Sequence, residues 1–298
     1  MGSVIRHPSR ILRTRLGAAV LAAATVFGAA ACGASAHDAV PRGATAVAAA
    51  ERPRPGTIVR DDLRAVFDAA GVRGTFALLD VRTRNTTVVD RRRAETRLVP
   101  ASSFKVPHAL VALETGAVQS PDEVIPWDGT PQPFPDWERD MTMREAVQLS
   151  NAAAFQVIAR RIGPERERRW LHRFHYGNRE IGTAADRFWL DGPLRISAVE
   201  QTRFLERLAA RRLPAAREHQ RTVRELIKQE ERDGYALFAK SGWENAPGPG
   251  TGWWVGWVER GGHVHTFALN IGIGEAGDAG KRATVARELL RRLHVLPA

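Results

Sequence analysis

Cysteine is almost absent from this sequence, since Cys32 is the only one among 298 residues. A single cysteine excludes an intrachain disulfide, so folding without disulfides is expected. The chain also has no internal repeat, no cluster of metal-ligating side chains and no glycine-rich phosphate loop. Hydrophobic residues make up 44% and charged residues 26%, which is typical of a globular protein with one large domain or two small ones.

Lysine is scarce as well. Of the 44 basic residues only four are lysines, and the others are arginine. Arginine keeps its charge, whereas a desolvated lysine can lose its proton and act as a base or nucleophile. A lysine kept in such a chain is therefore a candidate for chemistry that arginine cannot perform. The four lysines are Lys105, Lys228, Lys240 and Lys281.

Long hydrophobic runs are missing too. The apolar stretch at residues 16–31 is rich in alanine and shorter than the ~20 residues of a membrane-spanning helix. Four arginines precede it, and Ala34-Ser35-Ala36 offers a small-x-small cleavage site. Residues 1–36 are therefore predicted to be a signal peptide, and the protein to be secreted or periplasmic. Cleavage before Cys32 would instead leave a lipid-anchored protein. Residues 37–56 lack periodicity and are interpreted as a flexible leader.

Positive charge exceeds negative charge, with a formal net charge of +11. A basic chain raises the possibility of nucleic-acid binding, and Trp253, Trp254 and Trp257 would supply stacking surfaces. The arginines are dispersed and interleaved with acidic residues, as in residues 161–169, where Glu165 and Glu167 intervene. A solvated surface is therefore favoured over a nucleic-acid interface, which would need basic residues clustered on one face.

The chain divides into a strand-rich beginning, a helical middle and a strand-rich end. The helical middle is broken by proline-rich residues 117–140, after which a capping box at Thr142 and Glu145 begins the next helix. The expected helices cover residues 57–70, 102–113, 143–149, 153–162, 196–212, 218–229 and 279–293. The expected strands cover residues 74–81, 85–89, 236–240, 252–258 and 264–273.

Strands at both ends with helices between them predict an α+β fold. A central antiparallel sheet would be assembled from N-terminal and C-terminal strands, flanked by helices, with a helical region inserted between its halves. A single catalytic domain spanning residues 57–298 is expected, and the sequence leaves the oligomeric state open.

Ser102 and Lys105 form a Ser-x-x-Lys pair at the start of an expected helix. At this spacing both side chains share one helix face, and a neutral lysine there could take the serine proton. Alone the pattern is weak, because a helix cap followed by a surface lysine has the same spacing. The apolar residues 106–107 and 109–110 argue against a solvated lysine.

Two further segments strengthen the pair. The triplet at residues 240–242 ends an expected strand, where Lys240 and Ser241 could bind a carboxylate and Gly242 lets a ligand approach the backbone. Ser150 stands at a helix junction, where side chains can project over a cleft, although a simple N-cap is the plainer interpretation. The order Ser-x-x-Lys followed by Lys-Ser-Gly is typical of penicillin-interacting serine enzymes.

The chain resembles the class D (oxacillinase-type) serine β-lactamases along nearly all of its mature length. The resemblance is carried by ordered segments. They are Pro-Ala-Ser-Ser-Phe-Lys at 100–105, Trp-Asp-Gly at 127–129 with residues 134–142, Tyr-Gly-Asn at 176–178 with residues 180–182, residues 188–197 around Trp189, and the strands at 256–259 and 267–271.

The resemblance implies roles for these residues. Ser102 would be acylated by the β-lactam, and Ser150 would relay a proton to the leaving nitrogen. Lys240, Ser241 and Arg282 would hold the antibiotic's carboxylate, while the backbone N–H groups of Ser102 and Trp243 would form the oxyanion hole. No metal and no cofactor other than carbon dioxide or bicarbonate is implied.

Lys105 would be carboxylated by carbon dioxide and act as the general base in acylation and deacylation. This chemistry needs a neutral amine, which burial favours, and a donor to hold the carbamate, such as the indole N–H of Trp189. Trp189 as an ordinary core aromatic is the plainer alternative.

One departure from the family pattern is Ala152, where valine is usual. We expect the smaller side chain to leave the Lys105 carbamate more exposed to water. The main rival to a hydrolase is a penicillin-binding sensor or transpeptidase-like protein that is acylated without efficient turnover.

Overall fold

The computed structural model describes residues 56–232 and 234–297. The expected signal segment, Cys32 and nearly all of the expected leader lie outside these residues. A seven-stranded sheet has the order β1-β3-β2-β9-β8-β7-β6. Its strands are β1 (Thr57–Val59), β2 (Gly74–Asp80), β3 (Thr86–Val89), β6 (Lys228–Arg232), β7 (Tyr235–Trp243), β8 (Gly250–Arg260) and β9 (His263–Ile273), while β4 (Val124–Ile125) and β5 (Met141–Thr142) form a separate pair.

The sheet joins the two ends of the described chain, as expected. β2 from the N-terminal part pairs antiparallel with β9 from the C-terminal part, from Gly74 opposite Ile271 to Asp80 opposite His265. β8 and β9 are connected through Gly261 and Gly262, which both have positive φ and so form the tight turn that the sequence predicted. All strand pairs are antiparallel except β1 with β3.

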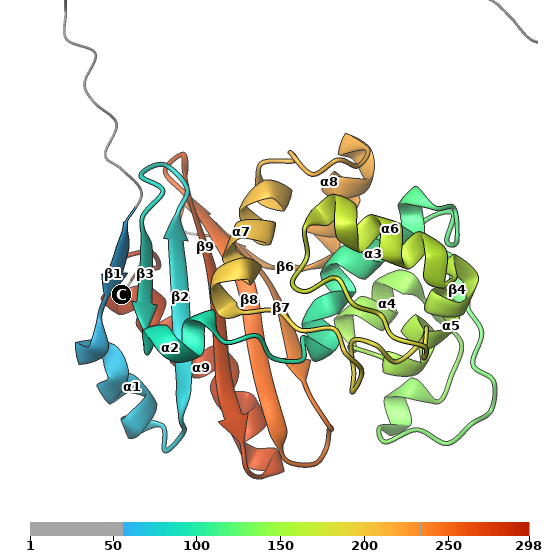
Figure 1. Ribbon diagram of the computed structural model, residues 1–298, viewed down its shortest axis with the longest axis horizontal. Coiled ribbons are helices and arrows are strands. Elements are labelled where there is room, and N and C mark those ends of the chain that lie inside the picture. The colour runs from blue at the N-terminus through green and yellow to red at the C-terminus, as the bar shows by residue number, and fades with distance from the viewer. Residues whose placement is uncertain (1–55, 233, 298) are drawn as a thin grey trace, which may run out of the picture. The chain divides into compact units, whose positions relative to one another are not determined.

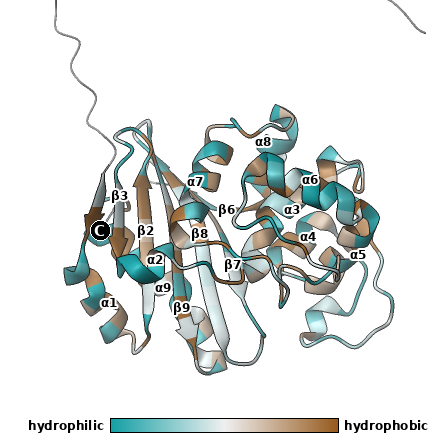
Figure 2. Cartoon of the chain, viewed as in Figure 1, coloured by the Kyte–Doolittle hydropathy of each residue, from teal (hydrophilic) through white to brown (hydrophobic). Residues whose placement is uncertain are grey.

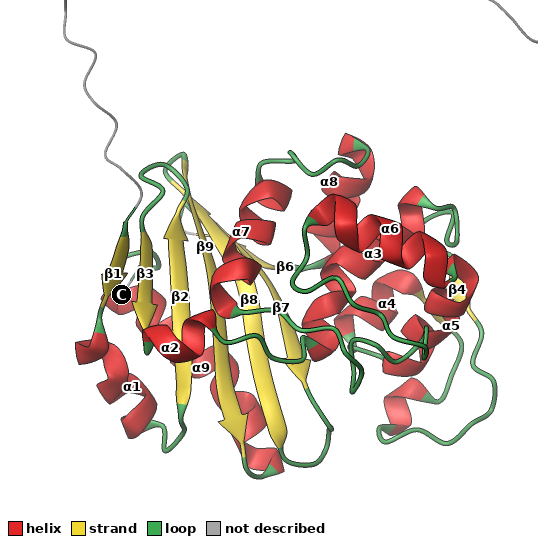
Figure 3. Cartoon of the chain, viewed as in Figure 1, coloured by secondary structure: helices red, strands yellow, loops and turns green. Residues whose placement is uncertain are grey.

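Helices cover both faces of the sheet and fill the insertion between β3 and β6 (Figures 1 and 3). α7 lies on one face, and α1 and α9 pack on the other (Figure 1). Within the described residues, no helix is both long and apolar enough to cross a bilayer. The helices are α1 (Arg64–Ala69), α2 (Arg91–Glu95), α3 (Lys105–Glu114), α4 (Met143–Gln148), α5 (Ala152–Ile162), α6 (Pro164–Phe174), α7 (Ala198–Ala209), α8 (Arg217–Leu226) and α9 (Lys281–Arg292).

α3 is the centre of the helical insertion. Its first nine residues, from Lys105 to Leu113, are all buried, and they pack with α5 and α8. The surrounding helices are amphipathic instead. α6 is largely hydrophilic in Figure 2, yet it buries Trp170, Leu171 and Phe174. A helix that is buried on all sides keeps its polar side chains away from solvent, which matters for Lys105 and His108.

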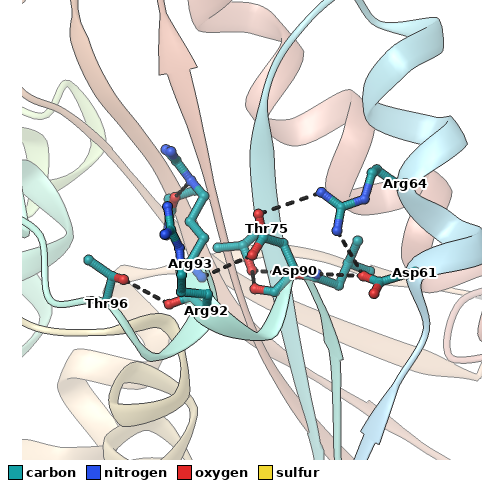
Figure 4. Close-up of polar contacts among 9 residues, drawn as sticks. Asp61, Arg64, Thr75, Asp90, Arg92, Arg93 and Thr96 are labelled. Carbon is teal, nitrogen blue, oxygen red and sulfur yellow. Dashed lines mark hydrogen bonds and ion pairs between the residues drawn. The ribbon is translucent and has the colours of Figure 1, made fainter.

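A short polar network fixes the path from the sheet to α3 (Figure 4). Asp90 caps α2 by accepting a hydrogen bond from the Arg93 N–H at 3.0 Å, and its side chain lies 3.6 Å from Arg64. Arg93 in turn donates to Asn270 Oδ1 of β9 at 2.7 Å, and Thr96 donates to the Arg92 carbonyl at 2.7 Å. α2 is thereby attached to the sheet six residues before Ala101, where the next helical turn begins.

Several elements differ from the sequence prediction. Residues 57–59 form a strand rather than the start of a helix, because they pair with β3 and leave Ile58 and Val59 about half exposed. The helix expected at 153–162 ends at Ile162 as predicted, and Pro164 begins a further helix, α6, that was not predicted, since proline fits the first turn of a helix. β6 and α2 were not predicted. Leu149, just after α4, is 36% exposed, whereas Val147 within the helix is buried.

Candidate active site

Ser102 lies in a 3-10 turn, Ala101–Phe104, which runs directly into α3. We call this segment the serine turn. Lys105 Nζ is 2.8 Å from Ser102 Oγ, and Lys105 has no exposed surface. The expected pair is therefore formed, and a surface lysine behind a helix cap is ruled out. The turn also holds Ala101 at a φ of +47°, a strained value of the kind that often accompanies functional sites.

Burial makes Lys105 a base. Desolvation, reinforced by the charge of Lys240, holds the pKa of the Lys105 amine well below its ordinary value. An amine with a lowered pKa is neutral at a lower pH, and only the neutral form can accept the hydroxyl proton of Ser102. Lys105 Nζ lies over the ring of Phe155, 5.2 Å from its centroid.

Gly242 brings the serine turn against the end of β7. A side-chain carbon at this position would lie 2.9 Å from the Pro100 carbonyl oxygen and 3.0 Å from the Ser103 nitrogen. The sequence predicted that this glycine lets a ligand approach the strand. The structure shows that the close neighbour is the protein's own backbone, so Gly242 sets the distance between β7 and Ser102.

Buried hydrogen bonds support the serine turn from behind. Ser103 Oγ donates to the Pro100 carbonyl at 2.7 Å and accepts from Gln201 Nε2 at 2.9 Å. Tyr176 O–H reaches Gln201 Oε1 at 3.4 Å, and burial raises the pKa of the Tyr176 phenol. Trp253 Nε1 donates to the Val99 carbonyl at 2.7 Å. Ser103 thus has a supporting role, consistent with Ser102 being the residue that faces Lys105.

Ser150 occupies the junction between α4 and α5 with a φ of +60°. It does not cap α5, because Asn151 accepts the capping hydrogen bond from the Ala154 N–H at 3.0 Å. Instead, Lys240 Nζ donates to Ser150 Oγ at 2.9 Å and to the Ser241 carbonyl at 3.1 Å. Burial, together with the charge of Arg282, lowers the pKa of Lys240 to about 7. Two of the expected site residues, Lys240 and Ser150, are therefore joined by a hydrogen bond along which a proton could be transferred.

Trp189 is fully buried, and its indole N–H has no hydrogen-bond partner among the described residues. The loop that carries it is held by Asn178, which donates to the Pro193 carbonyl at 2.7 Å and accepts from the Arg195 N–H at 2.9 Å. An unpaired buried donor is costly, so this N–H is suited to an acceptor that arrives from outside the chain.

The site opens into a pocket of about 470 Å³. Ser102, Ser150, Ser241, Gly242, Trp243 and Arg282 all line it. Arg282, from α9, donates to the Gly242 carbonyl at 2.6 Å, and burial lowers its pKa to about 10. Lys105, Lys240 and Trp189 are not part of this lining, and each is less than one-tenth exposed.

The sequence assigned no site role to the residues at the rim of the pocket. Phe134 and Trp137 come from the irregular proline-rich segment, with ring centroids 4.8 Å apart, and Gln156 and Leu190 also line the pocket. The support from Gln201 was not predicted either. Of these residues, only the two aromatic ones in the proline-rich segment could have been noticed in the sequence. A loop rich in both proline and aromatic residues often forms part of a binding surface. The tryptophans once considered for nucleic-acid stacking, at 253, 254 and 257, are all buried.

Comparisons with known proteins agree with this geometry. Residues 74–291 match the family described as penicillin binding protein transpeptidase domain. β-Lactamase OXA-5 of Pseudomonas aeruginosa is 40% identical over 227 residues, covering 75% of this chain and 85% of that protein.

Two solved structures are similar over most of the chain. FUS-1 (OXA-85), a class D β-lactamase from Fusobacterium nucleatum subsp. polymorphum, has a TM-score of 0.75 and 35% identity, covering 80% of this chain and 99% of that one. The class D β-lactamase YbXI from Nostoc has a TM-score of 0.76 and 36% identity, covering 80% and 100%. With this fold, this pocket and these relatives, the chain belongs to the class D β-lactamases.

Proposed function

We propose that the protein hydrolyses the β-lactam amide of penicillin-type antibiotics through an acyl intermediate on Ser102. The observation that carries this proposal is the 2.8 Å contact between Ser102 Oγ and a buried lysine of lowered pKa. Ser102 Oγ attacks the lactam carbonyl carbon while Lys105 takes its proton. The carbonyl–nitrogen bond then breaks, leaving the acyl group on Ser102. Water attacks the ester in the second half-reaction and releases the ring-opened acid.

Ser150 is proposed to give its hydroxyl proton to the leaving lactam nitrogen and to recover a proton from Lys240. The 2.9 Å contact between Lys240 Nζ and Ser150 Oγ supports this transfer. A group with a pKa of about 7 exchanges protons readily near neutral pH. Lys240 would thus act through Ser150, which modifies its expected role in holding the substrate.

The antibiotic's carboxylate is proposed to bind Ser241 and Arg282, which both line the pocket. Arg282 is largely desolvated there, and a partly buried guanidinium gains more from an anionic partner than an exposed one. The backbone N–H groups of Ser102 and Trp243 are proposed to stabilise the oxyanion. The closeness of Gly242 to the serine turn supports this pairing.

Carboxylation of Lys105 is the finer part of the proposal. Two observations fit it: the amine is buried with a lowered pKa, and the buried Trp189 N–H lacks a partner. Carbon dioxide bound to this amine would supply an anionic general base for both half-reactions. Trp189 would hold that group in place, while Ala152, which lines the pocket, would leave it more exposed to water than the usual valine.

We also propose that the enzyme acts outside the cytoplasm, as a secreted or periplasmic protein. The arginines and apolar run within residues 1–36 support export, and cleavage before Cys32 would add a lipid anchor. β-Lactams that reach the cell envelope would then meet the enzyme before their targets.

Mass spectrometry of the protein mixed with benzylpenicillin tests the proposal. The parent is expected to form an adduct on Ser102 that disappears as penicillin is consumed. Ser102→Ala should abolish both adduct and turnover. Ser103→Ala is the matched control, since it removes a hydroxyl from the same turn and should still be acylated. A stable adduct without turnover would identify a penicillin-binding sensor or transpeptidase-like protein instead. An adduct in Ser102→Ala would contradict the assignment of the nucleophile.

A further inference from the structure

A buried pair of ionisable side chains lies one helical turn beyond Lys105. His108 of α3 and Glu167 of α6 each have no exposed surface, and His108 Nε2 is 2.7 Å from Glu167 Oε1. We call these two residues the buried pair. None of their four side-chain nitrogen and oxygen atoms has a well-aligned hydrogen bond within the described part of the chain. Each side chain therefore has the other as its polar neighbour, and the contact ties α3 to α6.

The His108 ring belongs to the aromatic surroundings of Lys105 and Trp189. Its centroid is 4.8 Å from that of Trp189 in an edge-to-face arrangement, the shortest ring contact that Trp189 makes in the described structure. It is also 5.4 Å from Phe155, the ring over which Lys105 Nζ lies. His108 therefore contacts both the tryptophan whose N–H is unpaired and the phenylalanine beside the amine.

Stability does not account for the buried pair. Removing an acid and a base from water is costly, and their attraction repays the cost only when the remaining polar atoms are also hydrogen-bonded. Here they are not. Replacing such a pair by apolar side chains is commonly neutral or stabilising, so its presence needs another explanation.

We propose that the buried pair positions Trp189. Glu167 fixes the orientation of the His108 ring, and this ring, edge-on to the indole, holds Trp189 where its N–H can receive the group carried by Lys105. The inference rests on the proposed carboxylation of Lys105. The pair touches neither the pocket nor Ser102, so it acts through Trp189 and is a positioning unit rather than a catalytic one.

Three substitutions separate positioning from packing. Glu167→Gln keeps an acceptor for the His108 N–H, so bicarbonate dependence should stay within about twofold of the parent. Glu167→Leu removes the contact and should raise the bicarbonate concentration for half-maximal turnover about 10-fold, the usual scale for a supporting partner. The double variant His108→Phe with Glu167→Leu should match Glu167→Leu in bicarbonate dependence while melting at or above the parental temperature.

A second readout does not depend on turnover. Carbon-13 NMR of each protein in labelled bicarbonate reports the carbamate directly, and its signal should fall in Glu167→Leu and in the double variant but not in Glu167→Gln. Glu206→Gln is the matched control. It alters a buried carboxylate of α7 that pairs with Arg84 and Arg212, so it should lower the melting temperature and leave the carbamate signal unchanged.

The outcomes decide between the proposals. A parent with no carbamate signal and no bicarbonate dependence would overturn both this inference and carboxylation of Lys105. If the parent shows both a carbamate signal and bicarbonate dependence, and Glu167→Leu matches it in both, only the role of the buried pair is overturned. If Glu167→Leu does not fold, the pair is a stability element and the inference is also wrong.

Discussion

At the residue scale, the four lysines divide into two kinds. Lys105 and Lys240 are buried at the active site with lowered pKa values. Lys228 and Lys281 are surface residues paired with acids, and hydrogen bonds to Glu225 and Glu231 raise the pKa of Lys228. Burial, rather than residue type, thus separates the two lysines with lowered pKa values from the two that pair with acids at the surface.

Removal of the Lys105 amine should lower the activity of the protein and raise its stability. Lys105→Met is expected to lower turnover by about 10³-fold or more, because the base is lost. It should also raise the melting temperature by a few degrees, because an apolar group of similar shape replaces a desolvated amine. Lys228→Met is the control and should change neither turnover nor the melting temperature in this way. Calorimetry and penicillin hydrolysis measure both, and a Lys105→Met protein less stable than the parent would contradict the argument.

The lowered pKa of Lys240 predicts a pH dependence. Below pH 7 the amine is protonated and can resupply Ser150, whereas above its pKa of about 7 it is not. We therefore expect kcat/KM, which reports the free enzyme, to fall as pH rises through about 7. In Lys240→Arg the positive charge persists at all these pH values. The fall of kcat/KM near pH 7 should therefore disappear, even if the activity of this variant is low. A parental profile that is flat between pH 6 and 9 would rule out the relay.

Substitution of Ala152 tests whether the side chain at this position protects the Lys105 carbamate from water. If the small side chain admits water to a carbamate, Ala152→Val should need less bicarbonate for half-maximal turnover than the parent. Turnover at low and saturating bicarbonate measures the difference. Equal bicarbonate dependence of the two proteins would show that this position does not control loss of the carbamate.

At the scale of elements, the site depends on how closely the serine turn approaches β7. Gly242→Ala would place a methyl group 2.9 Å from the Pro100 carbonyl oxygen, so the turn must move. We expect a loss of about 1–3 kcal/mol in stability and about 10²-fold in turnover. Gly272→Ala is the matched control from β9, where the nearest atom is 3.9 Å away. Comparable losses in both variants would show that the close approach is not the cause.

The elements that were predicted correctly are marked by short sequence patterns within the element itself. The capping box at Thr142 and the tight turn after β8 both formed as expected. β1 and β6 escaped prediction because tertiary pairing creates them. β1 has the spacing of a helix but pairs with β3, and β6 consists of Lys-Gln-Glu-Glu-Arg with no apolar alternation. α6 was missed because Pro164 can end one helix or begin another.

At the scale of the whole described domain, the active site lies where three parts of the chain meet. The serine turn follows the N-terminal strands, Ser150 comes from the helical insertion, and residues 240–243 come from the C-terminal strands. Motif order in the sequence was enough to predict this convergence. It could not predict the buried pair, because His108 and Glu167 are 59 positions apart and each looks ordinary in its own helix. Their contact exists only through the packing of α3 with α6.

The most direct test of the account is penicillin hydrolysis by the purified protein, after removal of dissolved carbon dioxide and again after addition of bicarbonate. The account predicts low turnover in the first condition and a severalfold rise in the second, with Ser102 acylated in both. Turnover that is high and unaffected by bicarbonate would contradict a carboxylated Lys105, and no acylation of Ser102 in folded protein would contradict the mechanism as a whole.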